Sequence, residues 1–259
     1  MSELIQLEKR DHTAIITINN PPANTWTRES LKALEETIEA LNADRNIFAL
    51  VVTGQGEKFF SAGADLKTFA DGDIANAELM GGAFGRAFSA LSRFRGVSIA
   101  AVNGYAMGGG LECAMACDIR IAEEQAQMAL PEATVGLLPC AGGTQNLPWL
   151  VGEGWAKRMI LCGERIKADK ALSIGLVEEV VPGGAALDKA LELAEMAAKQ
   201  SPSSVARCKA LVMSARDGRS HDDGWRMERE LFVDLFRTED QQEGVNAFLE
   251  KRTPQWKNR

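Results

Sequence analysis

The stretch of sequence that decides the fold is AVNGYAMGGGLE, at residues 101–112. It follows an apolar segment at residues 98–103 that is typical of a buried strand, and it leads into an apolar segment at residues 111–117 that is typical of a short helix. The first turn of a helix has backbone N–H groups without intrahelical acceptors, so a glycine-rich turn at this place binds negative charge. The stretch therefore predicts a strand–turn–helix unit with an anion site at the turn.

A second turn of the same kind is SAGADL, at residues 61–66, where small side chains allow a ligand to approach the main chain. Neither turn matches the glycine patterns that bind dinucleotides or nucleoside triphosphates, so a nucleotide site is not favoured. A single turn of this type is more often an ordinary tight loop than a binding site. It is the presence of both turns that favours a binding site.

Two glutamates stand among apolar residues close to these turns. Glu112 lies in the predicted apolar helix, and Glu132 follows a proline in the segment ALPEATVG, at residues 129–136. A buried carboxylate without a partner is costly, so such residues are either surface or paired glutamates or functional ones. Their position beside two anion-binding turns favours the functional interpretation.

The remaining pattern predicts an α/β core followed by helices. Strands are expected at residues 4–9, 13–19, 47–53 and 118–122, and an amphipathic helix begins after the capping residue Thr27 and extends to about Leu41. Beyond residue 152 the pattern is mainly helical, with one strand at residues 176–181. Helices are expected at residues 156–161, 168–174, 186–199, 203–215, 225–236 and 241–250.

Composition excludes several classes of protein. The chain has 259 residues and a net charge of −7, without a basic cluster, so it is not expected to bind nucleic acid. Its five cysteines do not form a C-x-x-C pair, which favours reduced thiols in the cytoplasm and gives no support to a metal site. No apolar run is long enough for a membrane span, and the N-terminus has no apolar signal core.

Four ordered motifs together resemble the crotonase, or enoyl-CoA hydratase/isomerase, family. They are residues 61–66, residues 101–112, DIRIA at residues 118–122, and Pro131–Glu132 leading to GGTQ at residues 142–145. The resemblance implies an α/β fold in which a crotonase-like spiral of ββα units occupies residues 1–195. It also implies a helical C-terminal trimerisation region at residues 196–259, and a homotrimer or a hexamer built as a dimer of trimers.

The resemblance also implies a catalytic machinery. The backbone N–H groups of Ala64 and Gly109 match an oxyanion hole for the thioester oxygen of an acyl-CoA. Glu112 matches the base that activates water at C3, and Glu132 matches the acid that protonates C2. The expected reaction is the reversible hydration of a trans-2-enoyl-CoA to a 3-hydroxyacyl-CoA, as in β-oxidation.

Coenzyme A is expected to bind as part of the substrate, and no further cofactor or metal is implied. By resemblance, the CoA-binding residues come from the first turn and from the C-terminal helix of a neighbouring subunit. They are Ala62, Asp65, Leu66, Lys67, Phe248 and Lys251.

Two other functions remain open on this scaffold. One is a Δ3,Δ2-enoyl-CoA isomerase that uses mainly Glu132, and the other is a non-catalytic CoA-binding or RNA-binding protein. The glutamate pair favours hydration, and the acidic composition disfavours RNA. The acyl chain is not specified by the sequence: residues 68–85 are expected to border the acyl pocket, and Cys140 and Asn146 depart from the Gly and Arg that are common at these positions.

Overall fold

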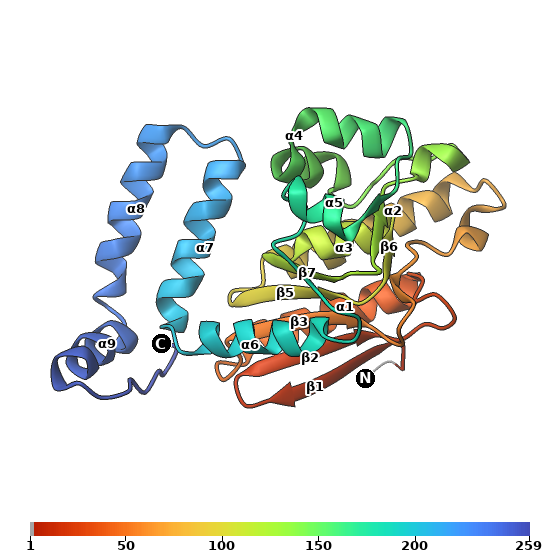
Figure 1. Cartoon of the computed structure of the whole chain (residues 1–259). Helices are drawn as coiled ribbons and strands as arrows, with labels where there is room; N and C mark the ends of the chain where they lie inside the picture. The colour runs from red at the N-terminus through yellow and green to blue at the C-terminus, as the bar shows by residue number, and fades with distance from the viewer. Residues whose placement is uncertain (1–2) are drawn as a thin grey trace.

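The computed structural model describes residues 3–259. The larger of its two sheets has six strands (Figure 1). The strand order is β1-β2-β3-β5-β7-β10, and all neighbours are parallel except the antiparallel pair β1 and β2. The residues of β3 are buried throughout, as expected of a central parallel strand with both faces covered. The strands are β1 (Ile5–Arg10), β2 (Thr13–Ile18), β3 (Ala49–Gly54), β5 (Val97–Val102), β7 (Ile119–Glu123) and β10 (Glu179–Val181).

A smaller sheet has the order β4-β6-β8-β9 and is assembled from very short strands. They are β4 (Phe59–Ser61), β6 (Tyr105–Met107), β8 (Gln127–Ala129) and β9 (Ile166–Lys167). The chain repeatedly supplies one strand to the large sheet, the next strand to the small sheet, and then a helix. This repetition is the predicted spiral of ββα units, and the α/β crotonase-like fold is therefore confirmed.

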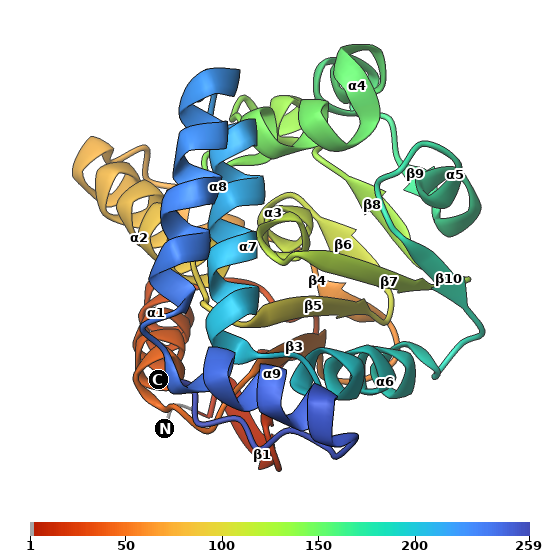
Figure 2. The ribbon, with the colours of Figure 1, turned by 90° about the vertical axis from the view of Figure 1, so that its left-hand side faces the viewer.

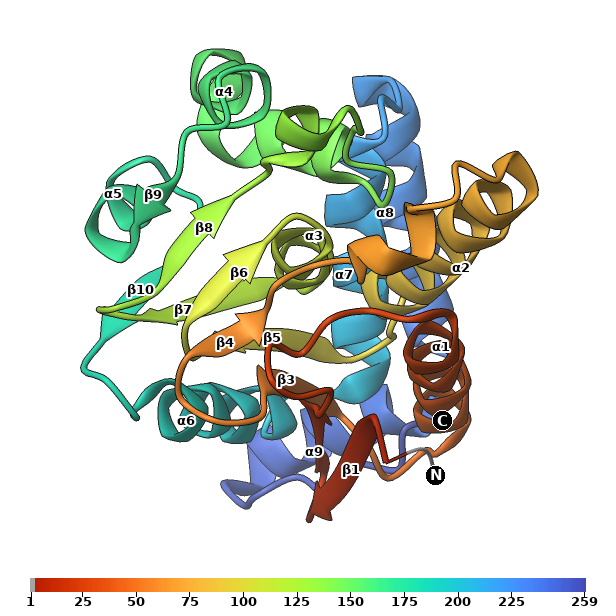
Figure 3. The ribbon, with the colours of Figure 1, turned by 90° about the vertical axis from the view of Figure 1, so that its right-hand side faces the viewer.

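Helices enclose the two sheets. The core helices are α1 (Arg28–Ala43), α2 (Ile74–Ser92), α3 (Gly109–Ala116), α4 (Gly143–Leu161), α5 (Ala168–Ser173) and α6 (Ala186–Ala198). The Thr27 side chain caps α1, whose buried residues include the predicted apolar positions Leu31 and Leu41. Every residue of α3 is buried, and Figure 3 shows this helix end-on in the middle of the molecule.

The structure contains helical residues that the sequence pattern did not predict. The whole of α2 was not expected, and α4 begins at Gly143 although a helix was predicted only from residue 156. A kink divides α4 at Gly152, where φ is 76°, and Pro148 lies inside the helix. Both features interrupt a simple helical period.

The C-terminal helices are α7 (Pro202–Arg216), α8 (His221–Leu235) and α9 (Glu239–Glu250). Figures 1 and 2 show α7 and α8 side by side along one flank of the core, with α9 below them. The predicted boundary between residues 195 and 196 falls in the last turn of α6. None of the helices formed by residues 3–259 is long and apolar enough to cross a membrane.

Candidate active site

The two glycine-rich turns cross each other at the N-terminus of α3. A Cβ atom on Gly110 would lie 2.1 Å from the carbonyl oxygen of Ser61, and one on Gly63 would lie 2.7 Å from the carbonyl oxygen of Met107. These distances are too short for any side chain, so glycine is required at both positions for the turns to touch. The close approach brings the residue after Gly63 to the start of α3.

Two backbone donors are left free where the turns cross. Trp26 N–H donates to the carbonyl oxygen of Gly63 and Asp65 N–H donates to that of Trp26, at 2.8 and 3.1 Å. The intervening Ala64 N–H takes no part in this ladder. Gly109 is the first residue of α3 and has no intrahelical acceptor. Neither N–H donates to any atom of the described chain, and both residues line the same pocket.

This active-site pocket has a volume of about 370 Å³ and is mainly apolar. It lies between α2, α3 and two short 3-10 helices, η1 (Leu66–Phe69) and η2 (Glu132–Val135). Its apolar side chains are Leu66, Phe69, Phe84, Val135, Leu137 and Leu138. Glu112 and Glu132 supply its carboxylates. An acyl thioester matches this combination of an apolar wall and a few polar groups.

Glu112 is fixed in position by the main chain. The residue is only 2% exposed, and its Oε1 accepts hydrogen bonds from the N–H groups of Ala141 and Gly143, both at 2.8 Å. Desolvation raises the pKa of Glu112, and the two N–H donors partly oppose that increase. No described residue donates to Oε2. One oxygen of this carboxyl is thus anchored while the other is available to a water molecule.

Glu132 opens η2 and has a different environment. Its Oε2 is buried and has no hydrogen-bond partner within residues 3–259. Desolvation and the charge of Glu112 raise the pKa of Glu132 to about 7. A hydrogen bond from its own backbone N–H acts in the opposite direction and lowers the pKa in part. A carboxyl with this pKa is protonated in about half of the molecules at neutral pH. The pocket therefore holds an anchored carboxylate and a second carboxyl that is able to donate a proton.

Six of the predicted site residues line this one pocket: Ala62, Ala64, Leu66, Gly109, Glu112 and Glu132. Asp65 instead caps η1 by accepting from the N–H of Lys67 at 3.1 Å, and Lys67 is exposed. Phe248 and Lys251 belong to α9 and its C-cap, on the far side of the molecule from α2 (Figure 1). A single chain does not bring these last two residues to the pocket.

Sequence reasoning did not identify the anchoring N–H groups of Ala141 and Gly143, nor Phe69 and Phe84 as individual pocket residues. Phe69 and Phe84 do belong to the region that was expected to border the acyl pocket. The spacing of Met80, Phe84 and Phe88 repeats every four residues and was the available signal for an inward-facing helix. The two anchoring donors depend on a contact across 29 and 31 residues, which no local pattern reveals.

Cys140 lies in the wall of the pocket beside the two glutamates. It has accessible surface because it faces the cavity, but neighbouring atoms still desolvate its thiol. Desolvation and the charges of Glu112 and Glu132 raise its pKa to about 11. The thiol is consequently protonated at neutral pH and is a poor nucleophile. The described residues contain no group of three or more His, Cys, Asp or Glu side chains placed to hold a metal ion.

The fold and the site together define a class of acyl-thioester enzymes. The chain belongs to the enoyl-CoA hydratase/isomerase family, whose pattern matches residues 8–259. It is 40% identical to the 2,3-dehydroadipyl-CoA hydratase of Escherichia coli K12 over 260 residues, which cover all of both chains. It is 39% identical to the short-chain-enoyl-CoA hydratase of Clostridium acetobutylicum, over 95% of this chain and 94% of that one.

Solved structures agree with this family assignment. Pseudomonas aeruginosa DspI is 66% identical and superimposes with a TM-score of 0.96, over 99% of this chain and 97% of that one. An enoyl-CoA hydratase from Bacillus anthracis is 36% identical and superimposes with a TM-score of 0.94, over 99% of this chain and all of that one. The predicted family is confirmed.

Proposed function

We propose that this protein is an enoyl-CoA hydratase that adds water to trans-2-enoyl-CoA thioesters. The observation that carries the proposal is the pair of carboxyl groups in one pocket: Glu112 is anchored through Oε1, and Glu132 has a pKa of about 7 and an unpaired Oε2. The names of relatives about 40% identical over the full length, which are hydratases, support the same enzyme class.

The free N–H groups of Ala64 and Gly109 bind the thioester oxygen in this proposal. Negative charge develops on that oxygen when a nucleophile adds at C3 and an enolate forms. Donors that are already oriented stabilise the enolate without reorganisation, and one such donor contributes about 3–4 kcal/mol. The N-terminus of α3 adds a favourable dipole at Gly109.

The two glutamates move the protons. Glu112 accepts a proton from water as the water oxygen forms its bond to C3, and Glu132 delivers its proton to C2. The product gains one hydroxyl and one hydrogen, so the atoms of one water molecule are added. Glu112 then carries the proton and Glu132 is ionised, and exchange with solvent restores the starting protonation state.

Replacing each glutamate by glutamine tests the assignment. Glu112→Gln and Glu132→Gln are each expected to lower kcat for crotonyl-CoA hydration by about 10²-fold or more, since each removes a positioned base or acid. Binding of the CoA thioester should change little. In the wild type, kcat/KM should fall as pH rises above about 7, because the raised pKa of Glu132 is where its proton is lost.

An isomerase gives a different result in the same experiment. It needs one carboxylate to carry one proton between two carbons, so Glu112→Gln would leave conversion of 3-enoyl to 2-enoyl thioester largely intact. The wild type would also hydrate poorly. Wild-type rates of hydration in both folded variants would refute the proposed mechanism.

We further propose a homotrimer or a hexamer in which Phe248 and Lys251 reach the CoA site of a neighbouring subunit, where Ala62, Asp65, Leu66 and Lys67 also contribute. The exposed apolar residues of α8 and α9 support this assembly. No cofactor besides the CoA of the substrate is needed, because the chain itself supplies the proposed acid, base and oxyanion donors. The five free cysteines support a cytoplasmic location, and the reaction is that of β-oxidation.

A further inference from the structure

The active-site pocket adjoins two other cavities. Cys140 lines both the active-site pocket and a neighbouring cavity of about 290 Å³, here called the middle cavity. A third cavity of about 430 Å³ lies under α7 and is here called the α7 cavity. The middle cavity and the α7 cavity share the lining residues Ser92, Ala116, Met213 and Arg216. The three cavities thus form a series from the glutamates to the inner side of α7.

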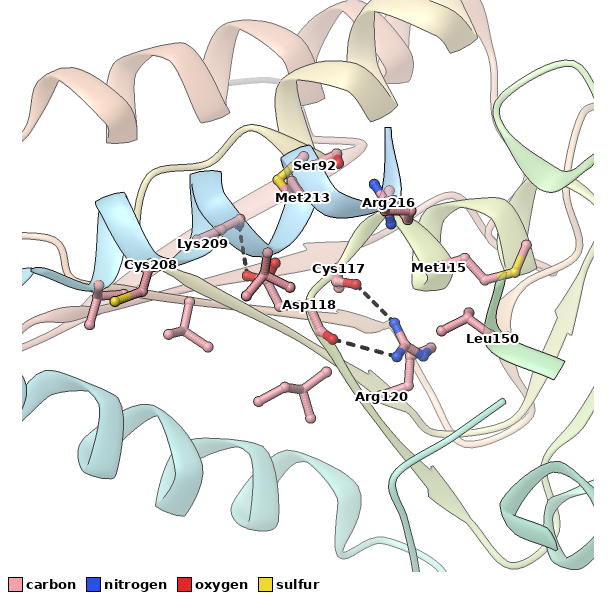
Figure 4. A pocket seen from close by; sticks show the side chains of 15 residues that line it. Ser92, Met115, Cys117, Asp118, Arg120, Leu150, Cys208, Lys209, Met213 and Arg216 are labelled. Atoms are coloured by element: carbon pink, nitrogen blue, oxygen red, sulfur yellow. Dashed lines mark hydrogen bonds and ion pairs between the residues drawn. The ribbon is translucent and has the colours of Figure 1, made fainter. Parts of the chain in front are cut away.

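The α7 cavity has a mainly apolar lining, and charged side chains also stand in its wall (Figure 4). Its apolar lining residues include Val97, Met115, Ile119, Leu150, Val205 and Met213. Two of its cationic side chains, Lys209 and Arg120, have several protein partners, whereas Arg216 has only a 3.9 Å ion pair with the adjacent Asp217. Lys209 Nζ contacts Asp118 Oδ2 at 2.7 Å and donates to the carbonyl oxygens of Phe94 and Gly96, at 2.7 and 3.2 Å. These bonds use all three of its donors.

Arg120 is similarly occupied. Its guanidinium donates to the carbonyl oxygens of Leu176 and Cys117, both at 2.9 Å, and it forms an ion pair with Glu178 at 2.5 Å. The α7 cavity therefore presents mainly alkyl and thioether groups to a ligand, with Lys209 and Arg120 engaged by the protein and Arg216 at its junction with the middle cavity. An alkyl chain fits this chemistry better than a charged group does.

The position of Cys140 indicates the direction in which the acyl chain of the substrate extends from the glutamates. It lines the active-site pocket together with Glu112 and Glu132, so it lies close to the carbons on which they act. Carbons beyond C3 that pass this residue enter the middle cavity. Asn146 also lines the middle cavity, and its side chain is short and neutral.

We infer that the alkyl tail of a long enoyl-CoA substrate passes Cys140, crosses the middle cavity and ends in the α7 cavity. This inference rests on the proposed hydratase activity and specifies its substrate class as long-chain enoyl thioesters. The middle cavity has polar walls that include Arg93 and Arg216, whose methylene stems are able to contact the chain.

The first test compares hydration of trans-2-enoyl-CoA thioesters of increasing length, from crotonyl-CoA to 2-dodecenoyl-CoA. Each methylene that becomes buried should raise kcat/KM by up to about fourfold until the α7 cavity is full. Met213→Trp fills the junction of the middle and α7 cavities. It should lower kcat/KM for 2-dodecenoyl-CoA by about tenfold or more relative to that for crotonyl-CoA.

Ser92→Phe narrows the same junction from α2 and provides a second variant if Met213→Trp does not fold. Ala215→Trp is the matched control, because Ala215 is an exposed residue of α7 that lines none of the three cavities. It should leave the ratio unchanged. Equal ratios in the wild type and both folded junction variants would overturn the inference, as would a preference for 2,3-dehydroadipyl-CoA over longer alkyl chains.

The second test does not depend on turnover. Cys208 lines the α7 cavity and is exposed, whereas Cys162 is exposed at the end of α4 and lines none of the three cavities. Peptide mass spectrometry measures the rate of alkylation of each cysteine. Dodecanoyl-CoA should slow the alkylation of Cys208, and butyryl-CoA should not. Cys162 should be alkylated at the same rate in the presence of either thioester. Equal protection by both thioesters would contradict the inference, as would a Cys208 already inaccessible in the ligand-free protein.

The two proposals fail in distinguishable ways. If no enoyl-CoA is hydrated at all, the proposed function fails, and the alkylation result still tests whether the alkyl chain occupies the α7 cavity. If crotonyl-CoA is hydrated but chain length and the junction variants have no effect, only the long-chain inference fails.

Discussion

The α/β core and the C-terminal helices differ in how much of their apolar surface is buried. All residues of β3 and α3 are buried, whereas α8 has no buried residue. Phe232 of α8 and Phe236 at its C-cap are 62% and 59% exposed, and Phe248 of α9 is 83% exposed. The interior of the core is buried by the chain itself, whereas the C-terminal helices carry an exposed apolar surface that is suited to contact with another chain.

Polar contacts hold the C-terminal helices to the core and to one another. Lys209 of α7 binds backbone carbonyls and Asp118 of the core, as described above. Asp240 of α9 is only 1% exposed and accepts hydrogen bonds from Ser203 of α7 and from the chain end. The active site, in contrast, depends on close backbone packing within the core. The two regions should therefore respond differently to substitution.

The largest effect is expected where a single backbone donor of the core is removed. Gly109 is the first residue of α3, a position at which proline is compatible with a helix but lacks the N–H group. Gly109→Pro should lower kcat for hydration by about 10²- to 10³-fold if this N–H forms the oxyanion hole. Steady-state kinetics with crotonyl-CoA measures the loss.

Gly109→Ala is the matched control for that substitution. A Cβ atom at this position would lie 2.9 Å from a ring carbon of Phe84, so both variants share the crowding due to Cβ, and proline adds that of its Cγ and Cδ atoms. Only the proline also removes the N–H group. If the two variants, both folded by circular dichroism, lose activity equally, Gly109 does not supply the donor.

A smaller effect is expected from the exposed apolar surface of α8. Phe232→Glu should weaken assembly by about 10- to 100-fold, because burying a Phe side chain contributes about 1.5–3 kcal/mol. Sedimentation should show a wild-type species larger than the 28.0 kDa chain and a shift of the variant towards 28.0 kDa. The unfolding of the core should be almost unaffected.

Gln242→Glu is the control for the added charge, because Gln242 is an exposed polar residue of α9. It should assemble like the wild type. A wild type that sediments only as a 28.0 kDa species at micromolar concentration would remove the basis of the proposed trimer and of a CoA site completed by Lys251.

The sequence predicted most of the large sheet and the two crossing turns because these features have local signals. The buried run in β3 and the periodic apolar positions of α1 are examples. It did not predict α2, whose segment contains Gly81, Gly82 and Gly85 and so has weak intrinsic helix propensity. Burial of Phe84 and Phe88 in the core stabilises that helix instead.

The residues of the candidate site were likewise predictable only where a local sequence signal marked them. Glu112 stood out as a carboxylate in an apolar segment, and the structure places it in the pocket with Glu132. The donors that anchor it, Ala141 and Gly143, are ordinary small residues whose role exists only through a distant contact. The series of cavities past Cys140 also depends on α7, which lies far along the chain from that residue. Long-range packing of this kind leaves no short pattern.

The smallest effect should come from the buried carboxylate that ties the C-terminal helices together. Asp240 Oδ2 accepts from Ser203 Oγ at 2.8 Å, and Oδ1 accepts from the N–H groups of Lys257 and Asn258 at 2.7 and 3.0 Å. Asp240→Asn keeps one oxygen for the two N–H donors and places an NH₂ group opposite the Ser203 hydroxyl, which is able to accept from it. It loses only the charge assistance of these bonds, at a cost of about 1 kcal/mol.

Urea unfolding at one fixed protein concentration measures that cost, since assembly makes apparent stability depend on concentration. Asp240→Leu should cost more than Asp240→Asn, because it leaves the N–H groups of Lys257 and Asn258 and the Ser203 hydroxyl without this acceptor. Hydration of crotonyl-CoA by the folded chain should be unchanged in Asp240→Asn, since the residue lies outside the active-site pocket. Equal stability of all three proteins would show that this polar contact contributes nothing measurable to holding the C-terminal helices together.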